Sequence, residues 1–64
     1  MNYRIYFYWE NRPGATHKDA QTHDGAIAIA KVKAANHKTL MSVEIVDDNY
    51  NREFISREEL CGIK

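Results

Sequence analysis

Aromatic and β-branched residues dominate the start of the chain, where YRIYFYW predicts a strand over residues 3–9. Apolar and polar side chains alternate partly along this segment, which is typical of a strand with one buried face. Two sets of side chains would then point to opposite faces of a sheet, and we expect the first set to face the core. The first set is Tyr3, Ile5, Phe7 and Trp9, and the second is Arg4, Tyr6, Tyr8 and Glu10.

Pro13-Gly14 indicates a turn after this strand, because proline fixes φ and glycine follows without a steric penalty. Residues 15–23 are polar and small, and they fit either a loop or a short strand that pairs back on the first. We favour a short, irregular strand around residues 16–21.

The segment GAIAIAKVKAAN predicts a helix that begins after Asp24 as N-cap, or after Thr22 as the alternative. Its alternating pattern would also suit a strand, but alanine packs poorly on a sheet and favours a helix. The small side chains would let this helix lie close to a sheet. Its apolar positions form two flanks, with Ile27, Ala30 and Ala34 on one and Ile29 and Val32 on the other.

A hairpin is predicted from two further strands, residues 40–46 and 52–55, joined by the turn residues Asp-Asp-Asn-Tyr-Asn. In the first of these strands Met41, Val43 and Ile45 should face one way, while Ser42 and Glu44 face the other.

The last residues predict a single helical turn. Ser56 and Glu59 fit a capping box, Leu60 and Ile63 would anchor the turn, and Gly62 would end it. The whole chain, 1–64, is then one small α+β domain. Its three- or four-stranded antiparallel sheet carries one helix in the order β-(β)-α-β-β, followed by the short helical turn.

Net charge is zero, but the charges are divided along the chain. Residues 1–38 hold six Lys/Arg and three Asp/Glu, a balance of +3, whereas residues 39–64 hold three Lys/Arg and six Asp/Glu, a balance of −3. A dedicated nucleic-acid-binding domain usually has a net basic charge. Two solvated faces that neutralise each other are the favoured interpretation of this division, and a charge dipole that steers a charged protein partner is the alternative.

The single cysteine, Cys61, cannot form an internal disulfide, and a reducing cytoplasm is the expected location. The sequence offers no apolar run long enough for a membrane span, so no membrane association is expected. The spacing of His17, His23 and His37 matches no zinc signature. Nucleophilic catalysis would need Cys61 or a serine beside a histidine, but Cys61 lies in the last four residues, where chains often fray. We also expect a chain this small to lack a pocket that excludes water. We expect no metal, no cofactor, no small-molecule substrate and no enzymatic activity.

Two surfaces remain as candidates for binding. Tyr50 at the hairpin tip is an aromatic residue in an acidic frame, which suits protein recognition because tyrosine is common among interface hot spots. This partner-binding set is Glu44, Asp47, Asp48, Asn49, Tyr50 and Glu53. The alternative is an aromatic and basic sheet face that stacks bases and contacts phosphates. That nucleic-acid-binding set is Arg4, Tyr6, Tyr8, Lys31 and Lys33.

An aromatic first strand (YRIYFYW), a small-residue helix (AIAIAKVKAAN) and an acidic-tipped hairpin (VEIVDDNYNREFIS) follow one another in 64 residues. This layout resembles small inhibitors encoded by phages and mobile elements, of which anti-CRISPR proteins are one group. The resemblance implies a non-enzymatic inhibitor in the cytoplasm of a bacterial host, where it would bind a nucleic-acid-handling protein of the host such as a Cas effector. Many such inhibitors are strongly acidic mimics of nucleic acid, and this neutral chain departs from that pattern.

The sequence therefore predicts a phage-encoded, protein-binding inhibitor whose acidic hairpin occupies a nucleic-acid-binding surface. A small nucleic-acid-binding or transcription-modulating module is the alternative. A homodimer joined through an open sheet edge is a third possibility.

Overall fold

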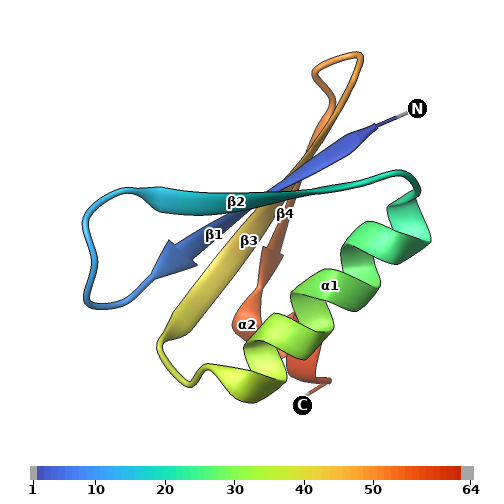
Figure 1. Ribbon diagram of the computed structural model, residues 1–64. Coiled ribbons are helices and arrows are strands. Elements are labelled where there is room, and N and C mark those ends of the chain that lie inside the picture. Colours follow the sequence, from blue (N-terminus) through green and yellow to red (C-terminus); the bar gives the residue numbers. More distant parts are fainter. Residues whose placement is uncertain (1, 63–64) are drawn as a thin grey trace.

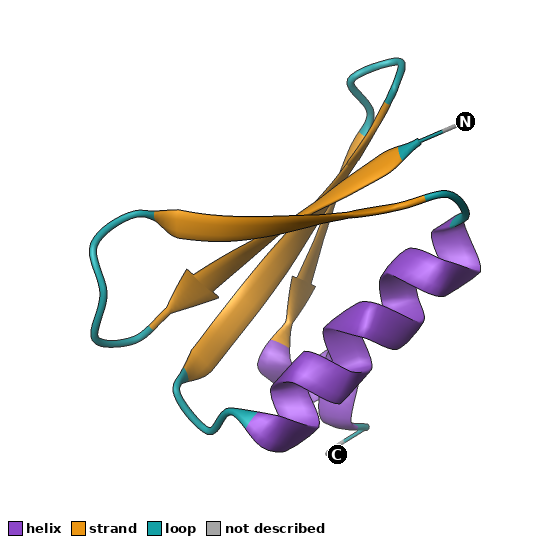
Figure 2. Cartoon of the chain, in the orientation of Figure 1, coloured by secondary structure: helices purple, strands orange, loops and turns teal. Residues whose placement is uncertain are grey.

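The computed structural model describes residues 2–62 and contains four strands and two helices. In chain order these are β1 (Tyr3–Trp9), β2 (Ala15–Ala20), α1 (His23–Asn36), β3 (Leu40–Asp47), β4 (Arg52–Ser56) and α2 (Arg57–Cys61). The strands form one twisted sheet, and both helices lie against the same side of it (Figures 1 and 2). The predicted α+β architecture is confirmed, with four strands rather than three.

The sheet order is β2-β1-β3-β4, and every neighbouring pair is antiparallel. β1 therefore lies inside the sheet. It pairs on one side with β2, which follows it after the loop of residues 10–14, and on the other side with β3, which follows α1 in the chain. The expected weak strand is real and covers Ala15–Ala20, one residue earlier than predicted. β2 and β4 are the two sheet edges.

The core lies between the sheet and the helices. Ile5 and Phe7 of β1 are fully buried, and Tyr3 and Trp9 pack beside them, as the alternation of β1 predicts. The other buried side chains come from each remaining element except β2: Ala26, Ala30, Ala34, Leu40, Val43, Ile45, Ile55 and Leu60.

Helix α1 meets the sheet through alanines, because Ala26, Ala30 and Ala34 are its buried residues. Short side chains at these positions bring the helix backbone close to the strands. Thr22, and not Asp24, is the N-cap, and its hydroxyl accepts a hydrogen bond from the Gly25 amide over 3.0 Å. A Cβ at Gly25 would lie 2.9 Å from the same hydroxyl, which makes glycine the residue that fits this cap.

The prediction that Met41 faces the same way as Val43 and Ile45 is wrong, because Val43 and Ile45 are buried and Met41 is not. The β1–β3 register shifts between Tyr8, which pairs with Ser42, and Trp9, which pairs with Leu40. Met41 is the extra residue of this β-bulge and is 55% exposed, while Leu40 takes the core position. A one-residue insertion reverses the inside and outside positions of a strand, which simple alternation cannot foresee.

Helix α2 has the predicted caps. The Ser56 hydroxyl accepts a hydrogen bond from the Glu59 amide over 3.3 Å, and Gly62 ends the helix in the left-handed conformation at φ 68°. Leu60 anchors the turn in the core. The second predicted anchor, Ile63, lies outside the described residues.

Candidate protein-binding surface

Both helices lie on one side of the sheet, and we call the opposite face of the sheet the open face (Figures 1 and 2). Pairing and alternation place the side chains of every second residue of each strand here. An antiparallel sheet often leaves one face to solvent, but such faces are usually polar. This one combines aromatic and charged side chains with one valine: Arg4, Tyr6, Tyr8, His17, Asp19, Glu44, Val46, Arg52 and Phe54.

Aromatic rings form two pairs on the open face. The Tyr6 and His17 rings lie 6.0 Å apart between β1 and β2, and the Tyr8 and Phe54 rings lie 6.1 Å apart across β3. Phe54 is 65% exposed despite its size. Exposed aromatic rings on a rigid sheet resemble the residues that carry most binding energy in protein interfaces.

Glu44 lies among these rings and is held by two neighbours. It accepts a hydrogen bond from the Tyr8 hydroxyl over 3.2 Å, and the Arg52 guanidinium lies 3.5 Å from its other oxygen. The pKa of Tyr8 is raised, mainly because the hydroxyl is partly buried and secondly because it donates a hydrogen bond to Glu44. The carboxylate thus positions the Tyr8 ring and is itself largely enclosed, since its side chain is 15% exposed.

The β3–β4 turn is organised by the Asp47 side chain. Its carboxylate accepts hydrogen bonds from the amides of Asn49 and Asn51 over 2.8 and 3.0 Å, and from the Asn51 side chain over 3.1 Å. These hydrogen bonds lower the pKa of Asp47, and the bond from the Asn51 amide has the largest effect. The turn is therefore a built structure and not a loose acidic loop.

Tyr50 is presented to solvent by this turn. It has φ 64°, a left-handed conformation that is costly for a non-glycine residue, and its side chain is 82% exposed. Asp and Asn adopt this conformation more readily than Tyr, so it falls on the least suited member of the turn. Strained residues of this kind occur often in binding sites.

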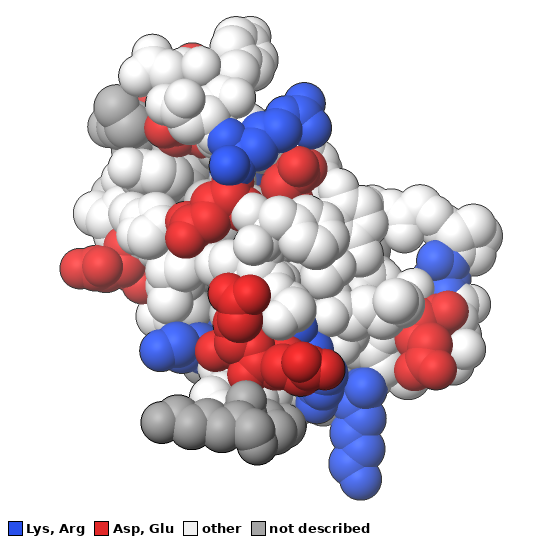
Figure 3. Space-filling model, turned by 180° about the vertical axis from the view of Figure 1, so that it is seen from behind, with Lys and Arg blue, Asp and Glu red and all other residues white. Residues whose placement is uncertain are grey.

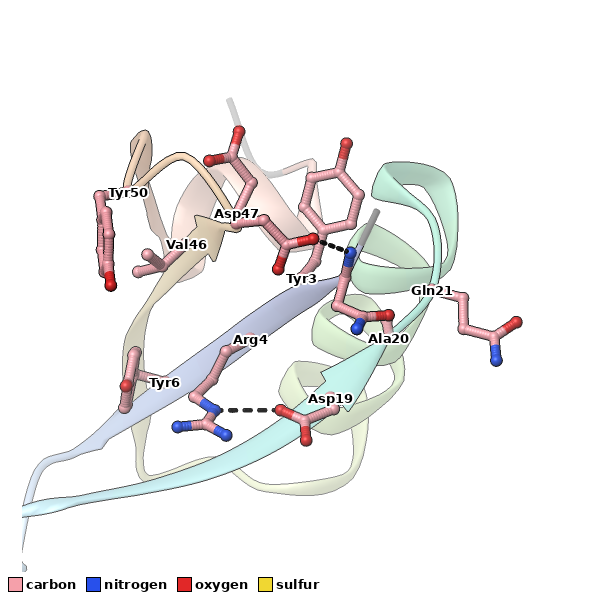
Figure 4. Close-up of a pocket in the computed structure, with 11 residues that line it drawn as sticks. Tyr3, Arg4, Tyr6, Asp19, Ala20, Gln21, Val46, Asp47 and Tyr50 are labelled. Carbon is pink, nitrogen blue, oxygen red and sulfur yellow. Dashed lines mark hydrogen bonds and ion pairs between the residues drawn. The ribbon is translucent and has the colours of Figure 1, made fainter.

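Tyr50 borders a shallow concavity at the hairpin end of the open face (Figure 4). Val46 and Tyr6 lie along its floor, and the Arg4 side chain points toward Asp19 across 3.1 Å. The Asp48 carboxylate accepts a hydrogen bond from the Asn2 amide over 2.9 Å, which joins the turn to the start of β1. The open face and Tyr50 thus form one continuous surface.

The structure divides the predicted acidic set between the two faces of the sheet. Asp47, Asp48, Asn49 and Tyr50 lie together in the turn, and Glu44 lies on the open face. Glu53 lies on the helix side, where its carboxylate is 2.6 Å from the His23 ring nitrogen of α1. Acidic and basic side chains are mixed over the side of the molecule drawn in Figure 3, where one group of acidic side chains lies at the lower centre of the view.

The predicted nucleic-acid-binding set is divided as well. Arg4, Tyr6 and Tyr8 lie side by side on the open face. Lys31 and Lys33 belong to α1 in the other layer, and the Lys33 ammonium lies 5.5 Å from the ring centre of the buried Phe7.

Phe54 is the main open-face residue that the sequence reasoning missed. The signal was present, because pairing of the hairpin strands places Phe54 opposite Glu44, a residue predicted to face outward. His17 and Val46 were missed for the same reason, since each takes its place on the face from a strand partner.

No group of three or more His, Cys, Asp or Glu residues within 2–62 is placed to hold a metal ion. Within the same residues, no helix has the length and apolar character needed to cross a bilayer. No family model, curated protein or solved structure matches this chain.

Proposed function

We propose that this protein is a non-enzymatic, protein-binding inhibitor that contacts its partner through the open face and Tyr50. The observation that carries the proposal is the exposure of Phe54 and Tyr50, 65% and 82%, on one rigid surface. Large exposed aromatic residues are costly to leave in water, and grouped ones are typical of interaction sites.

The charges of the open face favour a protein over a nucleic acid. Arg4 is paired with Asp19, and Arg52 with Glu44, so both guanidinium groups have carboxylates beside them. A phosphate backbone would meet these carboxylates, whereas a protein surface can match alternating charges. In this proposal the acidic side chains hold the arginines and the aromatic rings in position. They do not form the contiguous acidic patch that was expected from the sequence.

The partner class that we propose is a host nucleic-acid-handling protein, such as a Cas effector. It is supported by the resemblance of the chain layout to phage-encoded inhibitors. Binding would block the partner sterically, with Tyr50 entering a pocket and Phe54 packing at the centre of the contact.

The test is affinity capture of purified candidate effectors with the tagged protein and two matched variants. Phe54→Ser with Tyr50→Ser removes the two most exposed aromatic side chains of this surface, while Val32→Ser removes a 60% exposed apolar residue of α1 in the other layer. We expect the double variant to lose a stoichiometric partner and Val32→Ser to retain it, with both variants folded by circular dichroism. Equal retention by both variants would refute the open face as the binding surface.

A nucleic-acid-binding module is the second candidate, favoured by the adjacency of Arg4, Tyr6 and Tyr8 on the open face. Fluorescence titration with short single-stranded oligonucleotides separates the two. Micromolar binding that weakens steeply with salt would favour this candidate, and flat curves at low salt would remove it. Sedimentation at two concentrations tests the homodimer, which the exposed edges β2 and β4 would allow.

A further inference from the structure

A second concave surface lies on the helix side of the sheet, between β2 and α1. The two elements meet at the short connection before His23 and diverge from there (Figure 1). Two concavities lie between them, and Lys18, Lys33 and His37 line both. We call this continuous surface the basic groove.

The groove follows from how β2 and α1 pack. Lys18 pairs with Ile5, so its side chain is on the helix side of β2, but none of the β2 residues is fully buried. α1 packs against the sheet through its alanines. Its other flank, with Ile29 and Val32, therefore faces the groove. An apolar strip therefore lies beside lysines and is left partly open.

Positive charge gathers in this groove without compensation. Arg12, Lys18 and Lys33 line it, and none of its described lining residues is acidic. The Arg12 guanidinium lies 5.5 Å from the Trp9 ring centre, and Lys33 lies 5.5 Å from that of Phe7. Within residues 2–62 the ion pairs of the chain involve Arg4, His23 and Arg52 instead.

We propose that the basic groove binds an acidic amphipathic helix of a partner protein. Carboxylates of such a helix would meet Lys18, Lys33 and Arg12, while its apolar stripe would cover Ile29 and the 60% exposed Val32. A nucleic acid would satisfy the cations but offers no aliphatic side chains for the apolar strip. The groove shares no lining residue with the open face apart from His17, whose ring pairs with Tyr6 there, so this site is separate from the proposed inhibitory surface.

Trp9 supplies the readout, because it is the single tryptophan of the chain and lines the groove beside Arg12. The probe is a synthetic helical peptide of about 15 residues with leucines in one stripe and glutamates elsewhere. We expect saturable change of the Trp9 emission. A peptide with the same leucine stripe and lysines in place of the glutamates should leave the emission unchanged.

Charge reversal tests the position of the site. Lys18→Glu with Lys33→Glu should weaken binding of the acidic peptide by about tenfold or more. The matched control, Lys31→Glu with Lys38→Glu, changes net charge equally at exposed positions outside the groove, and it should stay within about twofold of wild type.

Three results would overturn the proposal. The first is no emission change with the acidic peptide, and the second is equal weakening in both double variants, which would mean unspecific attraction. The third is displacement of the peptide by a single-stranded oligonucleotide that binds more tightly, which would assign the groove to nucleic acid. Loss of open-face binding in the Phe54 and Tyr50 variant leaves the peptide titration intact, so the two proposals fail separately.

Discussion

The guanidinium of Arg57, the first residue of α2, donates a hydrogen bond to the carbonyl of His37, the residue that ends α1, over 2.8 Å. The same nitrogen also donates to the Leu40 carbonyl over 3.1 Å, and the second nitrogen donates to the Ala34 carbonyl over 3.0 Å. Helix C-termini leave carbonyls without partners and favour a cation. One side chain thus joins both helices and the start of β3.

Arg57→Ala should therefore destabilise the fold by about 2–3 kcal/mol, because three carbonyls lose a charged donor. Urea denaturation followed by circular dichroism measures the change. Arg52→Ala is the control, since Arg52 is exposed and has one long ion pair, and it should stay within about 0.5 kcal/mol of wild type. Similar losses in both variants would contradict the bridging role of Arg57.

Ala30 shows how closely α1 lies on the sheet, since it is fully buried. Ala30→Leu should cost about 1–3 kcal/mol or more, because the added carbons have no space between the two layers. Ala35→Leu adds the same atoms at an exposed position of the same helix and should change stability by about 0.5 kcal/mol or less. A neutral Ala30→Leu variant in the same denaturation assay would mean that the layers are further apart.

The contact between His23 and Glu53 makes stability depend on pH. The hydrogen bond that the His23 ring donates to the Glu53 carboxylate raises the pKa of His23 above its usual 6.5. A raised folded pKa stabilises the fold below the unfolded value, and this contribution is lost as pH rises through the folded value. Wild type should therefore exceed Glu53→Gln in Tm by more at about pH 5.5 than at about pH 8.5.

His23→Gln serves as the control for that comparison, because it removes the titrating group. In its background, Glu53→Gln should have the same effect at both pH values. A difference between wild type and Glu53→Gln that is constant with pH would show that the pair contributes nothing through protonation of His23.

Asp47 should act in the opposite pH direction. Its pKa is lowered from 3.8, so its contribution to the stability of the fold is present above that value and is lost as pH falls through the folded pKa.

Asp47→Ala should speed amide hydrogen exchange at Asn49 and Asn51 by about tenfold, measured by NMR. Asp48→Ala should leave both amides protected, because those bonds go to Asp47. Unchanged exchange in Asp47→Ala would contradict its role in holding the turn.

Substitutions at Tyr50 test whether its strained backbone conformation serves binding at a cost in stability. Tyr50→Gly removes the left-handed penalty of about 1–2 kcal/mol but makes the unfolded chain more flexible, so we expect a net gain of up to about 1 kcal/mol. Tyr50→Ala keeps the penalty and should give no gain. Both variants should lose binding to an open-face partner. A glycine variant that is less stable than the alanine variant would mean that the Tyr50 conformation is not strained in solution.

Local rules accounted for most of the elements. The alternation of Tyr3–Trp9 identified the buried face of β1, the Ser56 and Gly62 signals bounded α2, and alanine content identified α1. Each of these features depends on residues of a single strand or helix and its ends. Periodicity and capping chemistry act over that range, which is why the sequence was sufficient.

Pairing between distant segments decided the rest. The bulge at Met41 depends on how β3 aligns with β1, and the placement of Glu53 beside His23 joins residues thirty apart in the chain. Glu44 and Glu53 look like members of one acidic hairpin, yet strand alternation sends them to opposite faces. The sequence by itself determined which segments form strands and helices, because those preferences are local. The open face and the basic groove required the tertiary structure, since each brings together side chains from strands and helices that are distant in sequence.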